Sequence, residues 1–263
     1  MRPLARAFIS QWVRLRRPVV LLGTIGISVV FAALSTVLIF SHVTHTPPSA
    51  GDNYHAAYIG TVQQASGLMY GLTESIPLLG LVSIVTFSFV MASEYSYGTL
   101  RNLLVRQPRR MILLGGSYLA LISLMTVAVI LAMVAAITAA YLIAPGVGVS
   151  TAAWNVTAIF KVLGDVVLAV IGHGTFGAAL AVLFRSPVAA IGVAVGWAVA
   201  VENILAATIS GSERWLPGRL LSAIATHGTG TISFTHALAV GGVYALVAAV
   251  LAAVTFARAD VTS

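Results

Sequence analysis

Long apolar runs without charged residues alternate with short polar segments along this chain. A helix needs about 20 apolar residues to cross the hydrocarbon core of a bilayer. Several runs reach that length once the longest is divided at its Pro and Gly residues, namely residues 18–40, 75–92, 111–141, 154–184, 187–208 and 234–256. The pattern predicts an all-α integral membrane protein with six transmembrane helices, in which residues 1–263 form a single transmembrane domain.

The polar segment before the first run has the pattern of an amphipathic helix. Between residues 3 and 12, apolar side chains recur at helical spacing opposite Arg2, Arg6 and Gln11. A helix of this kind lies in the plane of the membrane surface with its apolar side toward lipid. We therefore expect an N-terminal interfacial helix that leads into the first span.

Basic residues gather beside the ends of the apolar runs. Only 8% of the residues are charged and 59% are hydrophobic, whereas about a quarter are charged in soluble domains, so lipid is the solvent for most of this chain. Arginines of the N-terminal segment and of residues 101–110, with Arg185 and Arg258, fall on one side, which the positive-inside rule makes cytoplasmic. An even number of spans puts both termini there. This topology explains the net charge of +7, and we expect no nucleic-acid partner.

No catalytic set stands out in the sequence. It contains no Walker A motif, no G-x-S-x-G elbow and no H-E-x-x-H helix, so we expect no enzymatic activity and no cofactor bound by this chain. His42, His45, Asp52 and His55 are a weak metal candidate, because there is no cysteine and no visible set of supporting ligands. We predict no metal site.

Closely spaced glycines in the apolar runs predict helix packing. Residues 172–177 match the letters of a dinucleotide-binding fingerprint, but they follow no strand and lie inside a run of lipid-spanning length. Gly192 and Gly196 repeat the small-xxx-small spacing that lets two helices approach closely. We expect the first group to pack against another span and the second against a neighbour, for which a second copy of the chain is one candidate.

Two polar pairs lie within or near the ends of predicted spans, where an ionisable group costs several kcal/mol unless it is paired or hydrated. Lys161 and Asp165 are spaced i and i+4, so they can form an intramembrane ion pair that is purely structural. Glu202 and Asn203, near the outer end of the fifth span, are the candidate for a translocation path. The alternative for Glu202 is a carboxylate that merely sits at the interface or hydrogen-bonds a neighbouring helix.

The densest polar stretch between two spans begins with Glu94, followed after three residues by Gly98-Thr99-Leu100-Arg101. It predicts a short amphipathic helix at the membrane surface that ends at Pro108. With the six-span order, this motif resembles the cytoplasmic loop of permease subunits in export-type ABC transporters of the type V exporter fold. The candidate partner-coupling residues are Glu94, Gly98, Thr99, Leu100, Arg101, Leu103, Leu104, Arg106 and, in the second cytoplasmic turn, Arg185.

The resemblance implies a multi-pass protein of the bacterial plasma membrane that pairs with a second permease copy or a homologous permease. Two separate ATP-binding cassette subunits would bind ATP and Mg and dock on the coupling helix between spans two and three. It also implies short outer helices within residues 209–235, for which an ordinary surface loop is the alternative. The cargo would be hydrophobic or amphipathic: a drug, a lipid or a peptide. A secondary transporter or an intramembrane enzyme remains the alternative, although no ion relay, internal repeat or catalytic set supports either.

Overall fold

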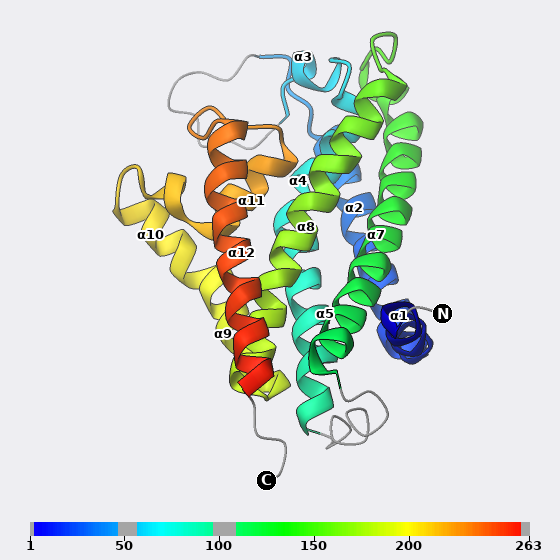
Figure 1. Ribbon diagram of the computed structural model, residues 1–263. Coiled ribbons are helices and arrows are strands. Elements are labelled where there is room, and N and C mark those ends of the chain that lie inside the picture. Colours follow the sequence, from blue (N-terminus) through cyan, green and yellow to red (C-terminus); the bar gives the residue numbers. More distant parts are fainter. Residues whose placement is uncertain (1–2, 47–56, 97–108, 259–263) are drawn as a thin grey trace.

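The computed structural model describes residues 3–46, 57–96 and 109–258, and their regular structure is helical (Figure 1). The α-helices are α1 Pro3–Leu15, α2 Pro18–Ser41, α3 Ile59–Val62, α4 Tyr70–Glu74, α5 Ile76–Ser96, α7 Arg110–Ile143, α8 Val156–Phe184, α9 Pro187–Val195, α10 Glu202–Thr208, α11 Pro217–Ala225 and α12 Phe234–Arg258. Short 3₁₀ turns occur at Gly67–Met69, Ala144–Val147 and Ser212–Trp215, and a π-helical segment occupies Gly196–Val201.

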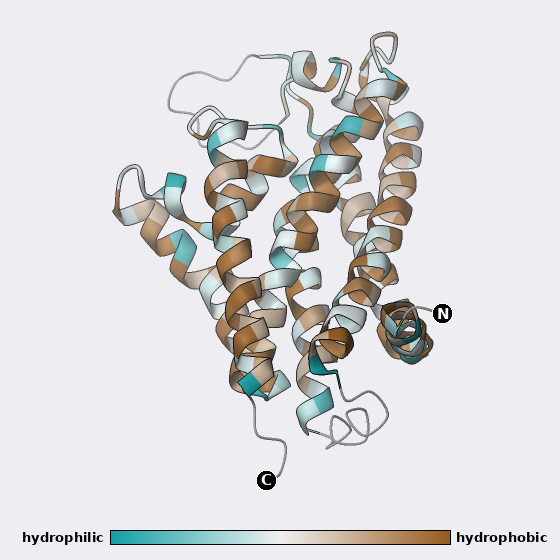
Figure 2. Ribbon diagram, in the orientation of Figure 1, coloured by the Kyte–Doolittle hydropathy of each residue, from teal (hydrophilic) through white to brown (hydrophobic). Residues whose placement is uncertain are grey.

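Six helical segments among the described residues are long and apolar enough to cross a membrane. They are Pro18–Ser41, Ile76–Ser96, Arg110–Val147, Val156–Phe184, Pro187–Thr208 and Phe234–Arg258. Figure 2 shows apolar residues along their whole length. Many of these side chains face outward: Val19 and Val188 are both 83% exposed, as expected where lipid rather than water surrounds the helix. The six predicted apolar helices are therefore confirmed.

Helices α5 and α8 form the centre of the bundle and lie very close together. Ser83 and Ser88 of α5 donate hydrogen bonds to the carbonyl oxygens of Val170 and Gly177 of α8, at 2.8 and 3.0 Å. A Cβ atom added to Gly177 would lie 2.5 Å from the carbonyl oxygen of Ile84. Small residues and hydroxyls hold membrane helices together in this way. Residues 172–177 thus serve the close packing that their spacing predicts.

The other glycine pair behaves differently. A Cβ atom added to Gly192 or Gly196 would meet no atom of the described residues within 4 Å. The predicted close neighbour of the fifth span at these glycines is therefore not another described part of this chain.

The fifth span is not one regular α-helix. Helix α9 passes at Gly196 into the π-helical segment, and α10 begins at Glu202. A π-helical segment widens the helix locally and shifts the side chains that follow it, and such segments are frequent at functional sites. In this chain it aligns Trp197 with Glu202, whose side chains form a hydrogen bond.

At the end of the bundle away from α1, a small aromatic cluster joins the connections between spans. Trp154 packs edge-on against Phe40 and Tyr141, and its indole N–H donates to the carbonyl oxygen of Val62 at 2.9 Å. Nearby, burial raises the pKa of Tyr70 to about 12, and the Glu74 carboxylate beside it acts in the same direction.

Candidate functional site

Glu94, the first residue of the predicted coupling motif, lies near the C-terminal end of α5 and is buried. Its carboxylate accepts a hydrogen bond from the Arg14 guanidinium of α1 at 2.8 Å. The Gln11 amide oxygen accepts a second bond from the same guanidinium at 3.2 Å. A carboxylate out of contact with water is costly unless it is paired. The motif is therefore joined to the N-terminal helix by an ion pair between residues 80 positions apart.

Helix α1 is seated on α7 by a backbone-level contact. A Cβ atom added to Gly116 would lie 2.7 Å from the Cβ atom of Ala7, so only glycine permits this approach. On the other side of α1, Ile9 and Val13 are 45% and 59% exposed. Figure 1 looks almost down the axis of α1, whereas the long helices run up the page, so α1 crosses the bundle axis steeply.

The ends of four long helices meet beside this ion pair. The ring of Tyr95 packs edge-on against Phe256 of α12 at 6.3 Å. The Ser96 hydroxyl donates to the carbonyl oxygen of Arg185, which follows α8, at 3.4 Å. The Arg110 guanidinium donates to the carbonyl oxygen of Ala257 at 3.4 Å. We call this end of the bundle, with α1, the basic end.

Arg185 forms the tight turn between α8 and α9. Its backbone is left-handed, with φ at 53°, and Ser186 then caps α9 by accepting the amide N–H of Ala189. This turn lies beside the end of α5, where the coupling motif begins. The structure thus brings Glu94 and Arg185 to the same end of the bundle. The other predicted coupling residues, Gly98, Thr99, Leu100, Arg101, Leu103, Leu104 and Arg106, lie outside the described residues.

Glu202 is buried and fully engaged with its own chain. One carboxylate oxygen accepts hydrogen bonds from the indole N–H of Trp197 and the backbone N–H of Gly218, both at 2.9 Å. Gly218 is the second residue of α11, where backbone N–H groups lack helical partners and favour a negative charge. The carboxylate of one helix therefore caps the start of another.

Asn203 strengthens the same junction from the surface. Its side-chain oxygen accepts a hydrogen bond from the Arg219 guanidinium at 2.9 Å, and its side-chain N–H donates to the carbonyl oxygen of Val199 at 2.7 Å. The sequence reading singled out Glu202 and Asn203 but missed their partners Trp197, Gly218 and Arg219. A signal existed, because the indole N–H of a tryptophan inside an apolar run needs an acceptor.

The expected ion pair between Lys161 and Asp165 is not formed in the structure. The Asp165 carboxylate lies instead 3.0 Å from the His227 ring nitrogen, in the connection between α11 and α12. His227 has a left-handed backbone, with φ at 58°, and its ring stacks on Phe234 at 4.1 Å. This conformation brings the ring to Asp165, whereas Lys161 is exposed. Among the described residues, Lys161 has no ion-pair partner.

The candidate metal ligands are only partly described, because Asp52 and His55 lie outside the described residues. In the described part of the chain, no group of three or more His, Cys, Asp or Glu residues is arranged to hold a metal ion. His173, the histidine within the glycine cluster, is buried and bonded through its ring to the carbonyl oxygen of Ala169 at 2.9 Å. The His173 ring also packs on α5, since a Cβ atom added to Gly80 would lie 2.7 Å from it.

The six apolar helices and the buried polar contacts at their ends define a polytopic membrane protein. Residues 32–262 match the model of a protein family of unknown function, DUF2705, and the chain belongs to that family. No protein with a curated description matches the chain.

Proposed function

We propose that this chain is the membrane-spanning permease subunit of an ATP-driven exporter of hydrophobic or amphipathic cargo. The observation that carries the proposal is the position of the E-x-x-x-G-T-L-R motif. Its glutamate ends a central span, is buried, and binds an arginine of the N-terminal helix. A segment that begins at such a junction can pass a push from a docked partner to two elements at once, α5 and α1.

The basic end is the docking side in this proposal. Arg14, Arg16, Arg17, Arg110 and Arg185 all belong to it by sequence position, and the positive-inside rule makes it cytoplasmic. Both termini are then cytoplasmic, in the plasma membrane of a bacterium. The amphipathic α1 lies at the inner surface with its exposed apolar side toward lipid, and α11 forms part of a short outer helical segment.

ATP binding and hydrolysis belong to two separate subunits, because this sequence has no Walker A motif. They dock on the segment after Glu94 and beside the turn at Arg185. Closure of these subunits pushes both contacts and shifts the spans as rigid bodies between two arrangements. A second permease copy or a homologous permease completes the path for the cargo, and Glu202 stands near its outer end.

The direct test is reconstitution with the ATP-binding cassette subunit encoded beside this gene. We expect the two proteins to copurify and the chain to change the subunit's ATP turnover. Arg101→Ala or Leu104→Ala should reduce copurification at least severalfold while membrane insertion is unchanged. Arg258→Gln is the matched control, since it removes a cation from the same end of the bundle but outside the motif.

Two results would count against the proposal. One is unchanged assembly and turnover after residues 98–104 are all replaced by a Gly/Ser linker. The other is a chain that inserts normally and neither binds nor stimulates any ATP-binding cassette subunit encoded near its gene.

A further inference from the structure

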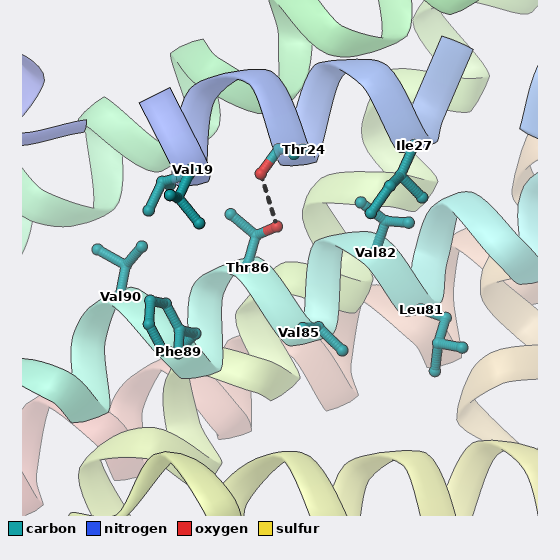
Figure 3. A pocket seen from close by; sticks show the side chains of 11 residues that line it. Val19, Thr24, Ile27, Leu81, Val82, Val85, Thr86, Phe89 and Val90 are labelled. Carbon is teal, nitrogen blue, oxygen red and sulfur yellow. Dashed lines mark hydrogen bonds between the residues drawn. The ribbon is translucent and has the colours of Figure 1, made fainter. Parts of the chain in front are cut away.

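A groove runs along the outer surface between α2 and α5. It has a volume of about 290 Å³. Figure 3 shows valine, isoleucine, leucine and phenylalanine side chains of both helices along its walls. The lining residues are Val19, Val20, Gly23, Thr24, Ile27, Leu81, Val82, Val85, Thr86, Phe89 and Val90. Phe89 is 40% exposed and Val19 83% exposed, so the groove opens outward.

The side chains that line the groove offer no free hydrogen-bonding group to a polar ligand. Its two hydroxyl groups, on Thr24 and Thr86, hydrogen-bond to each other at 3.1 Å, and both threonines are buried (Figure 3). Every other lining residue is apolar or glycine. A polar occupant would have to leave its own groups unpaired in this groove, so a hydrocarbon chain is the chemistry that fits.

The length and position of the groove match one leaflet. From Val19 to Ile27, α2 rises by about 12 Å at 1.5 Å per residue, and half of a hydrocarbon core is about 15 Å. The groove begins at the start of α2, directly after Arg16 and Arg17. It therefore runs from the basic end toward the middle of the bundle.

Cations without protein partners stand at the mouth of the groove. Arg16 and Arg17 are both exposed, and among the described residues their side chains form no ion pair or hydrogen bond. Arg17 precedes α2 without capping it through its side chain. The nearby carboxylate of Glu94 is already neutralised by Arg14. The mouth thus carries uncompensated positive charge beside an apolar groove.

We infer that the groove holds one acyl chain of an anionic phospholipid, with the lipid phosphate on Arg16 and Arg17. The charge and the apolar walls each match one half of that molecule. Each basic residue at the cytoplasmic surface raises the affinity for an anionic lipid about fivefold. This lipid site is distinct from the proposed transport function, and its test involves neither ATP nor cargo.

The test is native mass spectrometry of the detergent-purified chain titrated with dioleoylphosphatidylglycerol or dioleoylphosphatidylcholine. Gly23→Leu should fill the groove, because a Cβ atom added at Gly23 would meet no atom of the described residues within 4 Å. Gly26→Leu is the matched control on the same helix, equally open but outside the groove. We expect Gly23→Leu to weaken binding of both lipids about tenfold and Gly26→Leu to leave binding unchanged.

The double substitution Arg16→Gln/Arg17→Gln tests the headgroup contact separately. Since each of the two arginines contributes about fivefold, the unaltered chain should bind phosphatidylglycerol roughly 25-fold more tightly than phosphatidylcholine. The double variant should bind both lipids with the weaker affinity. Both arginines are exposed and unpaired, so the variant should fold as the parent does.

Three outcomes would overturn the inference. Gly23→Leu and Gly26→Leu could bind lipid equally, which would exclude the groove. The double variant could retain the preference for phosphatidylglycerol, which would exclude the two arginines. Finally, Gly23→Leu could convert a dimer to a monomer without changing lipid binding, which would make the groove an interface with a second copy of this chain.

Discussion

Substituting Arg14 should lower the free energy of unfolding more than substituting its ion-pair partner Glu94. The Glu94 side chain is 9% exposed, whereas the Arg14 side chain is 32% exposed. Arg14→Met therefore removes the cation that pairs with a buried carboxylate. Glu94→Gln leaves a cation that can turn toward water and still find hydrogen-bond acceptors.

The size of each effect follows from this difference in exposure. Removing one member of a buried pair costs about 3–5 kcal/mol, and partial hydration of Arg14 puts Arg14→Met at the low end, about 3 kcal/mol. Glu94→Gln keeps the shape and should cost about 1 kcal/mol. The double variant has neither charge to bury, so it should cost about 2 kcal/mol rather than the sum of both. The resulting coupling energy is about 2 kcal/mol, within the range for contacting residues.

The assay is reversible unfolding in mixed detergent micelles, monitored by the loss of the helical circular dichroism signal. Arg16→Gln is the matched control, because Arg16 is exposed and has no partner among the described residues. It should change stability by no more than about 0.5 kcal/mol. Additive single effects, within about 0.5 kcal/mol, would refute the claim that these two side chains are energetically joined. So would a larger cost for Glu94→Gln than for Arg14→Met.

Three further predictions use the same structure. Gly177→Ala should destabilise the chain by about 1–3 kcal/mol because its Cβ would meet the Ile84 carbonyl. Gly164→Ala in the same helix, whose Cβ would meet no atom of the described residues within 4 Å, should stabilise it by about 0.5–1 kcal/mol. Equal effects of the two substitutions in unfolding experiments would contradict this. The pKa of Tyr70 is raised to about 12 from 10.0, so this phenol favours the folded state below pH 10 and its contribution is lost between about pH 10 and 12; ultraviolet titration against Tyr70→Phe measures it, and a normal midpoint would refute it. The chain has no native cysteine, so impermeant thiol reagents should label Ser49→Cys from outside and Arg258→Cys from the cytoplasm; the reverse pattern would overturn the topology.

The positions of the long helices could be predicted because the bilayer imposes one local rule. A spanning segment must be long, apolar and helical to satisfy its backbone, and every part of that rule is visible in a window of about 20 residues. The predicted spans therefore agree closely with the observed ends; the third was expected from residue 111 and begins at Arg110. The π-helical segment Gly196–Val201 was not predicted, because its sequence is as apolar as the α-helix around it.

For each polar contact, the sequence identified only one of the two partners. Local patterns singled out Glu94, Glu202 and Asp165, since each is a carboxylate beside or inside an apolar run. Their partners Arg14, Gly218 and His227 lie 80, 16 and 62 residues away. No local periodicity encodes such distances. For Asp165 the local rule was misleading: Lys161 stands at the favourable i, i+4 spacing, yet the tertiary fold offers His227 instead.

The packing of α5 on α8 bears on how a displacement at the basic end would travel. Serine hydrogen bonds and glycine contacts join residues 80–88 of α5 to residues 170–177 of α8, so the two helices are expected to move as one body. In the middle of α8, Gly172 lies under Leu221 of α11, and nearer the start of α8 Asp165 holds the turn after α11 through His227. A displacement of the end of α5 would therefore be transmitted through α8 to α11.

Glu202 stands where that movement meets a more peripheral element. Its carboxylate holds the start of α11 to the fifth span, and that span is little buried within the chain. If α11 moves with α8 while the fifth span does not, the bonds from Trp197 and Gly218 to Glu202 are the ones that must break or be exchanged. A carboxylate that loses both donors needs water in their place. Under the proposed transport cycle, Glu202 thus forms a breakable hydrogen-bonded link between the fifth span and α11 at the outer end. This role requires no contact between its carboxylate and the cargo.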